Sequence, residues 1–168
     1  MRLIRQWLFA CALLGLAGAA APANPQNGVD YLTLPQAQNT DSGKKVEVTE
    51  FFAYYCPHCH VFESPLAAWV KRQGAGVSFK RVHVSAGAGV LPQQRLFYTL
   101  EAMGLLQQYH AKVFSAMHQE RLRLDSDGQV AEWAAGAGID PARFAHAYRS
   151  FGVEARLRRV GSVSRRFS

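Results

Sequence analysis

Cysteine is scarce in this sequence: its 168 residues include three cysteines, and two of them, Cys56 and Cys59, stand only two residues apart. A framework of disulfides, as found in many small secreted domains, needs several cysteines spread along the chain. Such a framework is therefore excluded, and the fold must depend on a hydrophobic core. The close spacing of Cys56 and Cys59 instead indicates a working dithiol.

No apolar run reaches the roughly 20 residues that a membrane-spanning helix needs. The stretch WLFACALLGLAGAA follows the basic residues Arg2 and Arg5 and precedes small residues at Ala21 and Ala23. A basic start, a short apolar centre and a small-residue end are the three parts of a secretory signal peptide. We therefore expect residues 1–23 to be removed after Ala21 or Ala23, and the mature chain to work in the periplasm without membrane insertion.

Acidic residues are outnumbered, twelve against nineteen basic ones, which gives a formal net charge of +7. The excess is concentrated at the end of the chain, where the last twenty residues hold six arginines and one glutamate. Basic and aromatic residues do not alternate elsewhere, as a nucleic-acid-binding surface would require. We expect no nucleic-acid partner and assign residues 152–168 to a basic C-terminal tail.

The central part of the sequence changes its hydrophobic period twice. KKVEVTEFFAYY, rich in β-branched and aromatic residues, predicts a strand whose later part is buried on both faces. PHCHVFESPLAAWVKRQ then has helical spacing, with Cys59, Phe62 and Leu66 on one side, and VSFKRVHV alternates as a second strand. Strand, helix and strand with short connections form a βαβ unit, and the cysteines lie where its first strand enters its helix.

Two further regions flank this unit. YLTL, residues 31–34, predicts a short strand before it. After it the pattern is helical: Pro92 begins one helix, Leu106 a second, a Ser126–Gln129 capping box a third, and Asp140 with the following proline a fourth. We therefore expect a βαβ portion over residues 24–90 and a helical domain over residues 91–151.

The CPHC sequence suits a reactive dithiol. A thiolate is the species that attacks a disulfide, and Cys56 at a helix N-terminus would lie at the positive end of the helix dipole. Pro57 has the backbone angle that a first helical residue needs, and His58 can donate a hydrogen bond or carry positive charge near Cys56. Cys59, one turn later, would face inward and resolve the mixed disulfide.

Glu50 stands among apolar residues of the first predicted strand, just before the cysteines. If it is buried there, its pKa should rise, because a poorly solvated carboxylate is costly, and it becomes a candidate for the functional site. If it instead marks the exposed face of an edge strand, it has no such role. The alternation of the strand leaves both positions open.

Two other chemistries use the same residues. Cys56, Cys59 and His60 spell C-x-x-C-H, the attachment sequence of c-type haem, but haem c domains are mainly helical, whereas this motif follows a strand. Zinc would need a second pair of ligands beyond this one turn, and the sequence offers none with suitable spacing. We expect no metal and no cofactor apart from the redox-active Cys56–Cys59 disulfide, and retain haem electron transfer as the alternative function.

The segments EFFAYYCPHCHVFE and VSFKRVHV, and the helical stretch after them, resemble DsbA-type thiol:disulfide oxidoreductases from about Val46 to about Arg159. The resemblance implies an α/β thioredoxin-like fold with an inserted helical domain. It also implies an activity, the donation of a disulfide to unfolded, cysteine-containing exported proteins. A membrane-bound DsbB-type oxidase would then restore the disulfide.

The resemblance also implies a role for each matched residue. Cys56 corresponds to the nucleophile and Cys59 to its buried partner. Pro57 and His58 correspond to the dipeptide that tunes the redox potential, and Glu50 to the buried acid that assists Cys59.

One part of the family pattern is absent from this sequence. The family continues with a segment that contains a cis-proline and then with a β-hairpin, whereas no proline follows Pro141 here. We therefore expect the C-terminal part of the sheet to be missing. A catalytically impaired, truncated homologue is the second alternative function.

Overall fold

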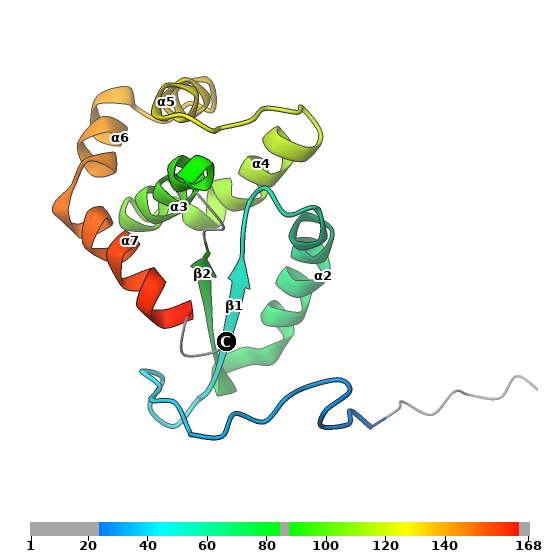
Figure 1. The fold of residues 1–168 in the computed structure, drawn as a ribbon. Helices are drawn as coiled ribbons and strands as arrows, with labels where there is room; N and C mark the ends of the chain where they lie inside the picture. The colour runs from blue at the N-terminus through cyan, green and yellow to red at the C-terminus, as the bar shows by residue number, and fades with distance from the viewer. Residues whose placement is uncertain (1–23, 85–87, 165–168) are drawn as a thin grey trace, which may run out of the picture. The chain divides into compact units, whose positions relative to one another are not determined.

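A parallel pair of strands joined by one long helix forms the part of the fold that carries the cysteines (Figure 1). The structure is a computed structural model, and it describes residues 24–84 and 88–164. Strand β1 (Val46–Phe52) leads into helix α2 (Pro57–Gln73), and a short 3-10 helix, η1 (Gly74–Gly76), leads into strand β2 (Val77–His83). The strands pair from Val46↔Val77 to Phe52↔His83, so the predicted βαβ unit is confirmed.

The strands are less buried than the sequence predicted. In β1 only Phe52 is buried as a whole residue and in β2 only His83, while Phe51 is half-buried. The expectation that the later part of β1 is buried on both faces was therefore wrong. The reason is that, among the described residues, the sheet consists of β1 and β2 alone, and a pair of strands is covered less completely than the centre of a wider sheet.

Residues 24–37 belong to a separate unit of the chain. The strand predicted at residues 31–34 is not present there; Tyr31 makes an isolated bridge to Asn27. A local turn is formed instead, in which the backbone N–H of Gly28 donates to the carbonyl of Tyr31 at 2.7 Å and the Asp30 carboxylate accepts from the backbone of Gln26 at 2.9 Å. The predicted signal peptide and its cleavage sites lie outside the described residues.

The region after β2 is helical, as predicted. A 3-10 helix, η2 (Ala88–Val90), is followed by α3 (Leu91–Ala102), α4 (Leu106–His118), α5 (Asp127–Gly136) and α6 (Pro141–Tyr148). The predicted capping box of α5 is confirmed, with Gln129 N–H donating to the Ser126 hydroxyl, and Asp140 caps α6 by accepting from Arg143 N–H at 2.7 Å. Such caps stabilise a helix start by about 1 kcal/mol each.

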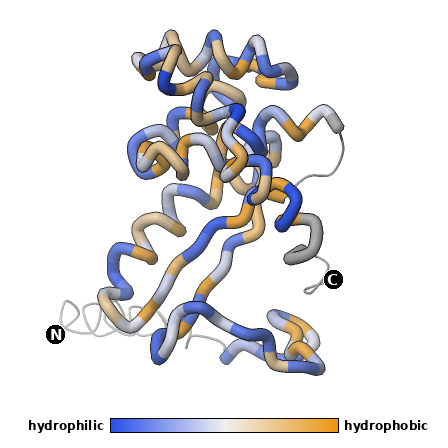
Figure 2. Tube along the Cα trace, turned by 90° about the vertical axis from the view of Figure 1, so that its left-hand side faces the viewer, coloured by the Kyte–Doolittle hydropathy of each residue, from blue (hydrophilic) through white to orange (hydrophobic). Residues whose placement is uncertain are grey.

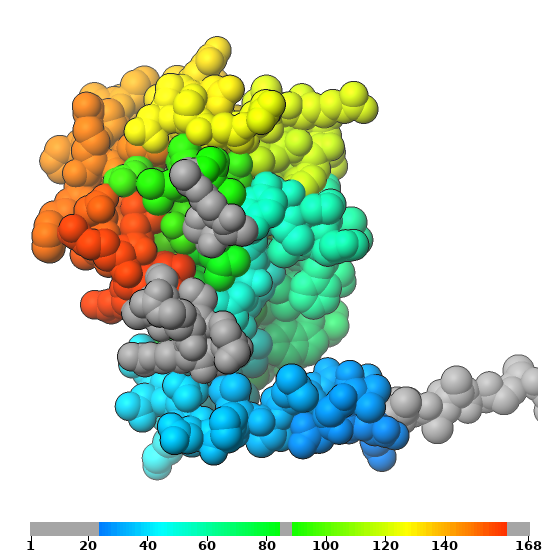
Figure 3. All heavy atoms as spheres, in the orientation of Figure 1, coloured from blue at the N-terminus to red at the C-terminus, as the bar shows by residue number. Residues whose placement is uncertain are grey.

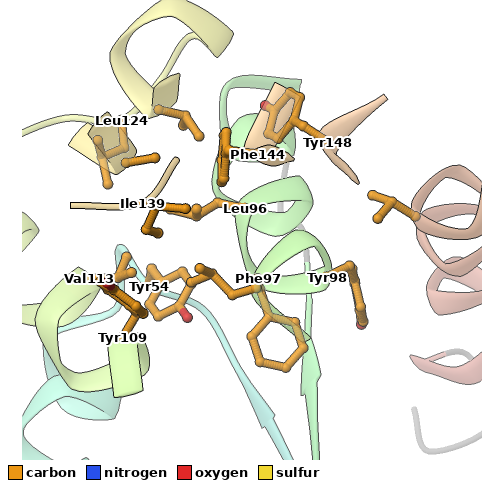
Figure 4. Packing of buried hydrophobic residues seen from close by; sticks show 14 of the residues in the cluster. Tyr54, Leu96, Phe97, Tyr98, Tyr109, Val113, Leu124, Ile139, Phe144 and Tyr148 are labelled. Atoms are coloured by element: carbon orange, nitrogen blue, oxygen red, sulfur yellow. The ribbon is translucent and has the colours of Figure 1, made fainter. Parts of the chain in front are cut away.

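Helix α3 lies at the centre of the hydrophobic core. Its residues from Leu96 to Leu100 are all buried. In Figure 3 the green part of the chain lies between the yellow and orange atoms of the later helices and the cyan atoms of the βαβ unit. Figure 4 shows Leu96 near Ile139 and Phe144. Each such large apolar side chain contributes about 1.5–3 kcal/mol by leaving water, so the core fixes the end of β1 relative to the helices.

The segment assigned to a basic tail forms a helix, α7 (Phe151–Ser164), which packs against α3. Val153 and Val160 are buried on its inner side, and Glu154 accepts from Arg95 of α3 at 2.8 Å. The spacing of Val153, Leu157 and Val160 is that of an amphipathic helix, a signal that the concentration of arginines concealed. Figure 1 shows α7 and α2 on either side of the strand pair.

No helix in the described part of the chain is both long and apolar enough to cross a bilayer. Figure 2 shows hydrophilic and hydrophobic residues interspersed along the chain.

Candidate dithiol site

Cys56 is the N-cap residue of α2, in the place that the sequence predicted. Its backbone is extended, with φ −78° and ψ 115°, and its sulfur accepts from the backbone N–H of Cys59 at 3.4 Å. A turn closes just before it, with the N–H of Cys56 donating to the carbonyl of Ala53 at 3.1 Å. The sulfur therefore lies at the positive end of a helix of 17 residues, which favours an anion.

The pKa values of the two thiols are shifted in opposite directions. A hydrogen bond from the Cys59 thiol is the main cause that lowers the pKa of Cys56, and the backbone N–H groups of Cys59 and His58 lower it further against the effect of burial. Burial raises the pKa of Cys59, and the nearby charges of Cys56 and Glu50 add to the rise. Both cysteines are free thiols, as in a reduced dithiol.

The opposite shifts predict the order in which the thiols are alkylated. Near neutral pH, Cys56 should react with iodoacetamide at least about ten times faster than Cys59, because each unit of pKa separation is a tenfold difference in thiolate. Limited labelling of the reduced protein followed by peptide mass spectrometry measures both rates. In urea the two rates should converge, and faster labelling of Cys59 in the folded protein would contradict the assignment.

Pro57 and His58 are both exposed at the start of α2, and Pro57 is the first helical residue, as predicted. The backbone N–H of His58 contributes to the low pKa of Cys56. The tuning role expected for the His58 imidazole stays a prediction.

Glu50 is a paired and largely buried acid. It lies opposite Arg81 in the strand register, and Arg81 Nε donates to its Oε2 at 3.0 Å, with 11% of the Glu50 side chain exposed. Burial raises the pKa of Glu50, and the Arg81 guanidinium opposes the rise. The structure thus decides between the two positions that the sequence left open. The exposed-edge position is excluded.

Two more charged residues join this acid, and the sequence analysis did not identify them. Arg81 Nη2 donates to both oxygens of Glu63 at 2.9 Å, and the Glu63 side chain is 13% exposed. The spacing of Cys59 and Glu63, one helical turn apart, was a signal that Glu63 shares the inner side of α2 with Cys59. The pairing with Arg81 had no such local signal.

Tyr54, two residues before Cys56, is hydrogen-bonded by three histidines from two elements, one at the end of β2 and two on α4. Its backbone N–H donates to His83 Nε2 at 3.1 Å, its hydroxyl lies 2.9 Å from His110 Nδ1, and its carbonyl accepts from His118 Nε2 at 2.7 Å. Tyr54 is fully buried. These contacts fix the loop that places Cys56 at the helix start.

The outer side of α2 differs from the prediction. Phe62 was expected on the buried side with Cys59 and Leu66, but it is 54% exposed. Three residues after Cys59, Phe62 is turned by about 60° from it around the helix axis, so it lies at the margin of the inner side, whereas Leu66 lies closer to its middle. His60, on another side of α2, stacks its ring on that of His118 of α4 with centroids 4.7 Å apart.

Among the residues that the structure describes, no three His, Cys, Asp or Glu side chains are grouped so that they could hold a metal ion.

The sequence of this chain is similar to those of several known proteins. The chain is 40% identical to the thiol:disulfide interchange protein DsbA of Burkholderia cepacia over 146 residues, which are 84% of this chain and 68% of that protein. It is 37% identical to DsbA of Bordetella pertussis over 158 residues, 94% of this chain and 75% of the relative. No protein-family model matches the chain.

Solved structures give the same result. A single-substitution variant of Pseudomonas aeruginosa DsbA superposes with a TM-score of 0.81 at 29% identity, covering 86% of this chain and 78% of that one. The oxidoreductase DsbA of Xylella fastidiosa superposes with a TM-score of 0.74 at 31% identity, covering 81% and 75%. The sequence comparison and the structure comparison therefore both lead to DsbA proteins.

Proposed function

Because this chain belongs to the DsbA family of thiol:disulfide interchange proteins, a family of thiol:disulfide oxidoreductases, we propose that Cys56 and Cys59 form its redox-active dithiol. One observation carries the assignment. Cys56 caps the N-terminus of α2 and has a lowered pKa, whereas burial raises the pKa of Cys59, three residues later in the same helix. This asymmetry gives the two thiols different tasks. The relatives support disulfide exchange, and nothing in them favours the haem alternative.

The exchange begins from the Cys56–Cys59 disulfide. A substrate thiolate attacks Cys56 Sγ, the bond to Cys59 breaks, and Cys59 leaves with the electron pair and takes up one proton. A second substrate thiolate then attacks the substrate sulfur of the mixed disulfide, and Cys56 leaves as a thiolate. The substrate gains one disulfide and the protein gains two electrons. The helix N-terminus stabilises the Cys56 thiolate, which makes the reduced protein more stable and the disulfide more oxidising.

Substrates and partners follow from the compartment. The signal-peptide pattern and the family support a periplasmic location, and we propose that the chain works there on cysteine-containing exported proteins. A membrane-bound DsbB-type oxidase would accept the two electrons and restore the disulfide. In this scheme the only redox group is the dithiol itself, and Pro57 and His58 set its potential.

A redox titration against glutathione tests the function. Oxidised protein mixed with reduced glutathione should yield the reduced dithiol and glutathione disulfide, with the equilibrium toward reduced protein. Alkylation of free thiols followed by mass spectrometry gives the equilibrium constant. A dithiol that forms no disulfide at any glutathione ratio would contradict the proposal.

The same titration isolates the contribution of the His58 side chain. His58→Leu should make the disulfide less oxidising by about 30 mV, which equals about 1.4 kcal/mol for two electrons and is the size of one charge-assisted hydrogen bond. If the redox potential is unchanged in His58→Leu, the helix N-terminus alone stabilises the Cys56 thiolate and the imidazole has no part in it.

A further inference from the structure

Two histidine rings lie face to face beside the dithiol, and the exchange described above uses neither of them. His60, the fourth residue of α2, and His118, the last residue of α4, have ring centroids 4.7 Å apart and ring planes that differ by 3°. The ring of Phe114, one turn before His118, packs against both, with centroids 5.7 and 6.1 Å away. Both histidines are half-buried. The pair therefore joins the start of α2 to the end of α4.

His118 also holds the backbone just before Cys56. The Tyr54 carbonyl can only accept a hydrogen bond, so the His118 Nε2 atom, 2.7 Å away, carries the hydrogen. On the other side of the same residue, the Tyr54 N–H donates to the ring of His83. The side chain of Tyr55, which follows, is exposed and adds little to this hold. The hydrogen bond from His118 thus fixes the peptide unit between Tyr54 and Tyr55.

These contacts form a closed cycle around the first turn of α2. The His118 ring donates to the Tyr54 carbonyl and stacks on His60. The backbone N–H of His60 then donates to the carbonyl of Cys56 at 3.1 Å, and the chain itself leads from Cys56 back to Tyr54. A histidine at the end of a helix has several rotamers, and stacking on a second ring favours one of them. His60 therefore keeps the His118 Nε2–H directed at the carbonyl.

The cycle surrounds the groups that stabilise the Cys56 thiolate. The sulfur accepts hydrogen bonds at the start of α2, from the Cys59 thiol and from the backbone N–H groups of His58 and Cys59. Hydrogen bonds weaken steeply as their distance and angle depart from the optimum, so a small rotation of the turn would weaken all of them. A contact that holds the turn therefore also holds the sulfur in the position where its thiolate is stable.

We propose that His118 and His60 are positioning residues for the nucleophile. His118 fixes the Tyr54 carbonyl, His60 fixes the His118 ring, and together they keep the Cys56 sulfur against the N–H groups that stabilise its thiolate. Both act through the backbone of the turn and not through contact with the sulfur. Because α4 belongs to the helical region and α2 to the βαβ unit, the helical region thereby sets the reactivity of the dithiol. The proposal deepens the proposed function and rests on it.

The ionisation of Cys56 in the reduced, full-length protein tests the proposal. Ultraviolet absorbance of the thiolate, followed against pH in a Cys11→Ala background, gives its ionisation constant. In His118→Leu the carbonyl loses its donor, and the constant should fall about fivefold, the factor that corresponds to one helix-capping interaction. In His118→Gln the side-chain amide N–H can reach the position of Nε2, so the constant should stay within about twofold of that of the parent protein.

His60 provides a second, independent pair of variants. His60→Phe keeps a ring that can stack on His118, and the constant should stay within about twofold, whereas His60→Ala frees the His118 ring and should lower the constant about threefold. His146→Leu is the matched control, because His146 is an exposed histidine of α6 outside the cycle of contacts, and the ionisation of Cys56 should not change.

A role in packing alone predicts a different result. His118→Leu and His60→Ala would then unfold at a lower temperature while the ionisation constant of Cys56 stays the same, and that result overturns the proposal. Equal losses in His118→Gln and His118→Leu would also overturn it, since the glutamine retains the donor. If His118→Leu does not fold, the two His60 variants decide. The measurement needs no substrate, so a failed glutathione titration with these shifts present would remove the proposed function and leave the positioning role.

Discussion

Replacing Cys59 by alanine is expected to convert the protein into a trap for its substrates. The Cys56 thiolate can then attack a substrate disulfide, which forms a mixed disulfide and releases one substrate thiolate, but no resolving thiol remains in the protein to break the mixed disulfide. Most of the Cys59→Ala protein should therefore be found in covalent complexes that a reductant dissolves. Non-reducing electrophoresis after mixing with oxidised, unfolded protein measures the complexed fraction.

The matched variant is Cys56→Ala, which keeps one cysteine in the same motif. It should form almost no complexes and transfer no disulfide above the uncatalysed rate, because the remaining thiol is only partly exposed and its pKa is raised. Both variants are made in a Cys11→Ala background so that a retained leader adds no thiol. Equal trapping by the two variants would show that the cysteines have no distinct roles.

Replacing Arg81 by methionine is expected to reduce the free energy of unfolding by about 3–5 kcal/mol at neutral pH, because two buried carboxylates lose their shared partner. Without Arg81, the folded-state pKa values of Glu50 and Glu63 rise above their unfolded values. Acids with raised folded-state pKa values weaken the fold as the pH rises through that window, so the loss should be smaller at about pH 5 than at about pH 8. Urea denaturation at both pH values measures it.

Lys80→Met is the control for this change. Lys80 is the preceding residue of β2 and pairs with Asp41 and Glu47, but its side chain is 37% exposed and that of Asp41 94%. Ion pairs that water screens contribute little, so the expected change is within about 1 kcal/mol. Equal losses for both variants, or a loss for Arg81→Met that grows in acid, would contradict the account of a buried network.

Local pattern alone determined much of this protein. The switch from strand to helix at Cys56 and the caps at Ser126 and Asp140 each depend on residues within about four positions of one another. Such local features form regardless of which distant segments pack against them. The placing of the dithiol at a helix N-terminus is of this kind. Helix α7 is also of this kind, since Val153, Leu157 and Val160 have the spacing of an amphipathic helix despite the many arginines between and after them.

Only the tertiary structure decided what surrounds the dithiol. Arg81 is 31 residues from Glu50 and 18 from Glu63, and Tyr54 is 56 residues from His110, so these partners are set by strand register and by the packing of α4. Periodicity shows which side of an element is apolar, but a buried acid becomes tolerable only when a distant chain segment supplies its counter-charge. For that reason the sequence left Glu50 undecided and gave no sign of His110, while it placed Cys56 correctly from its immediate neighbours.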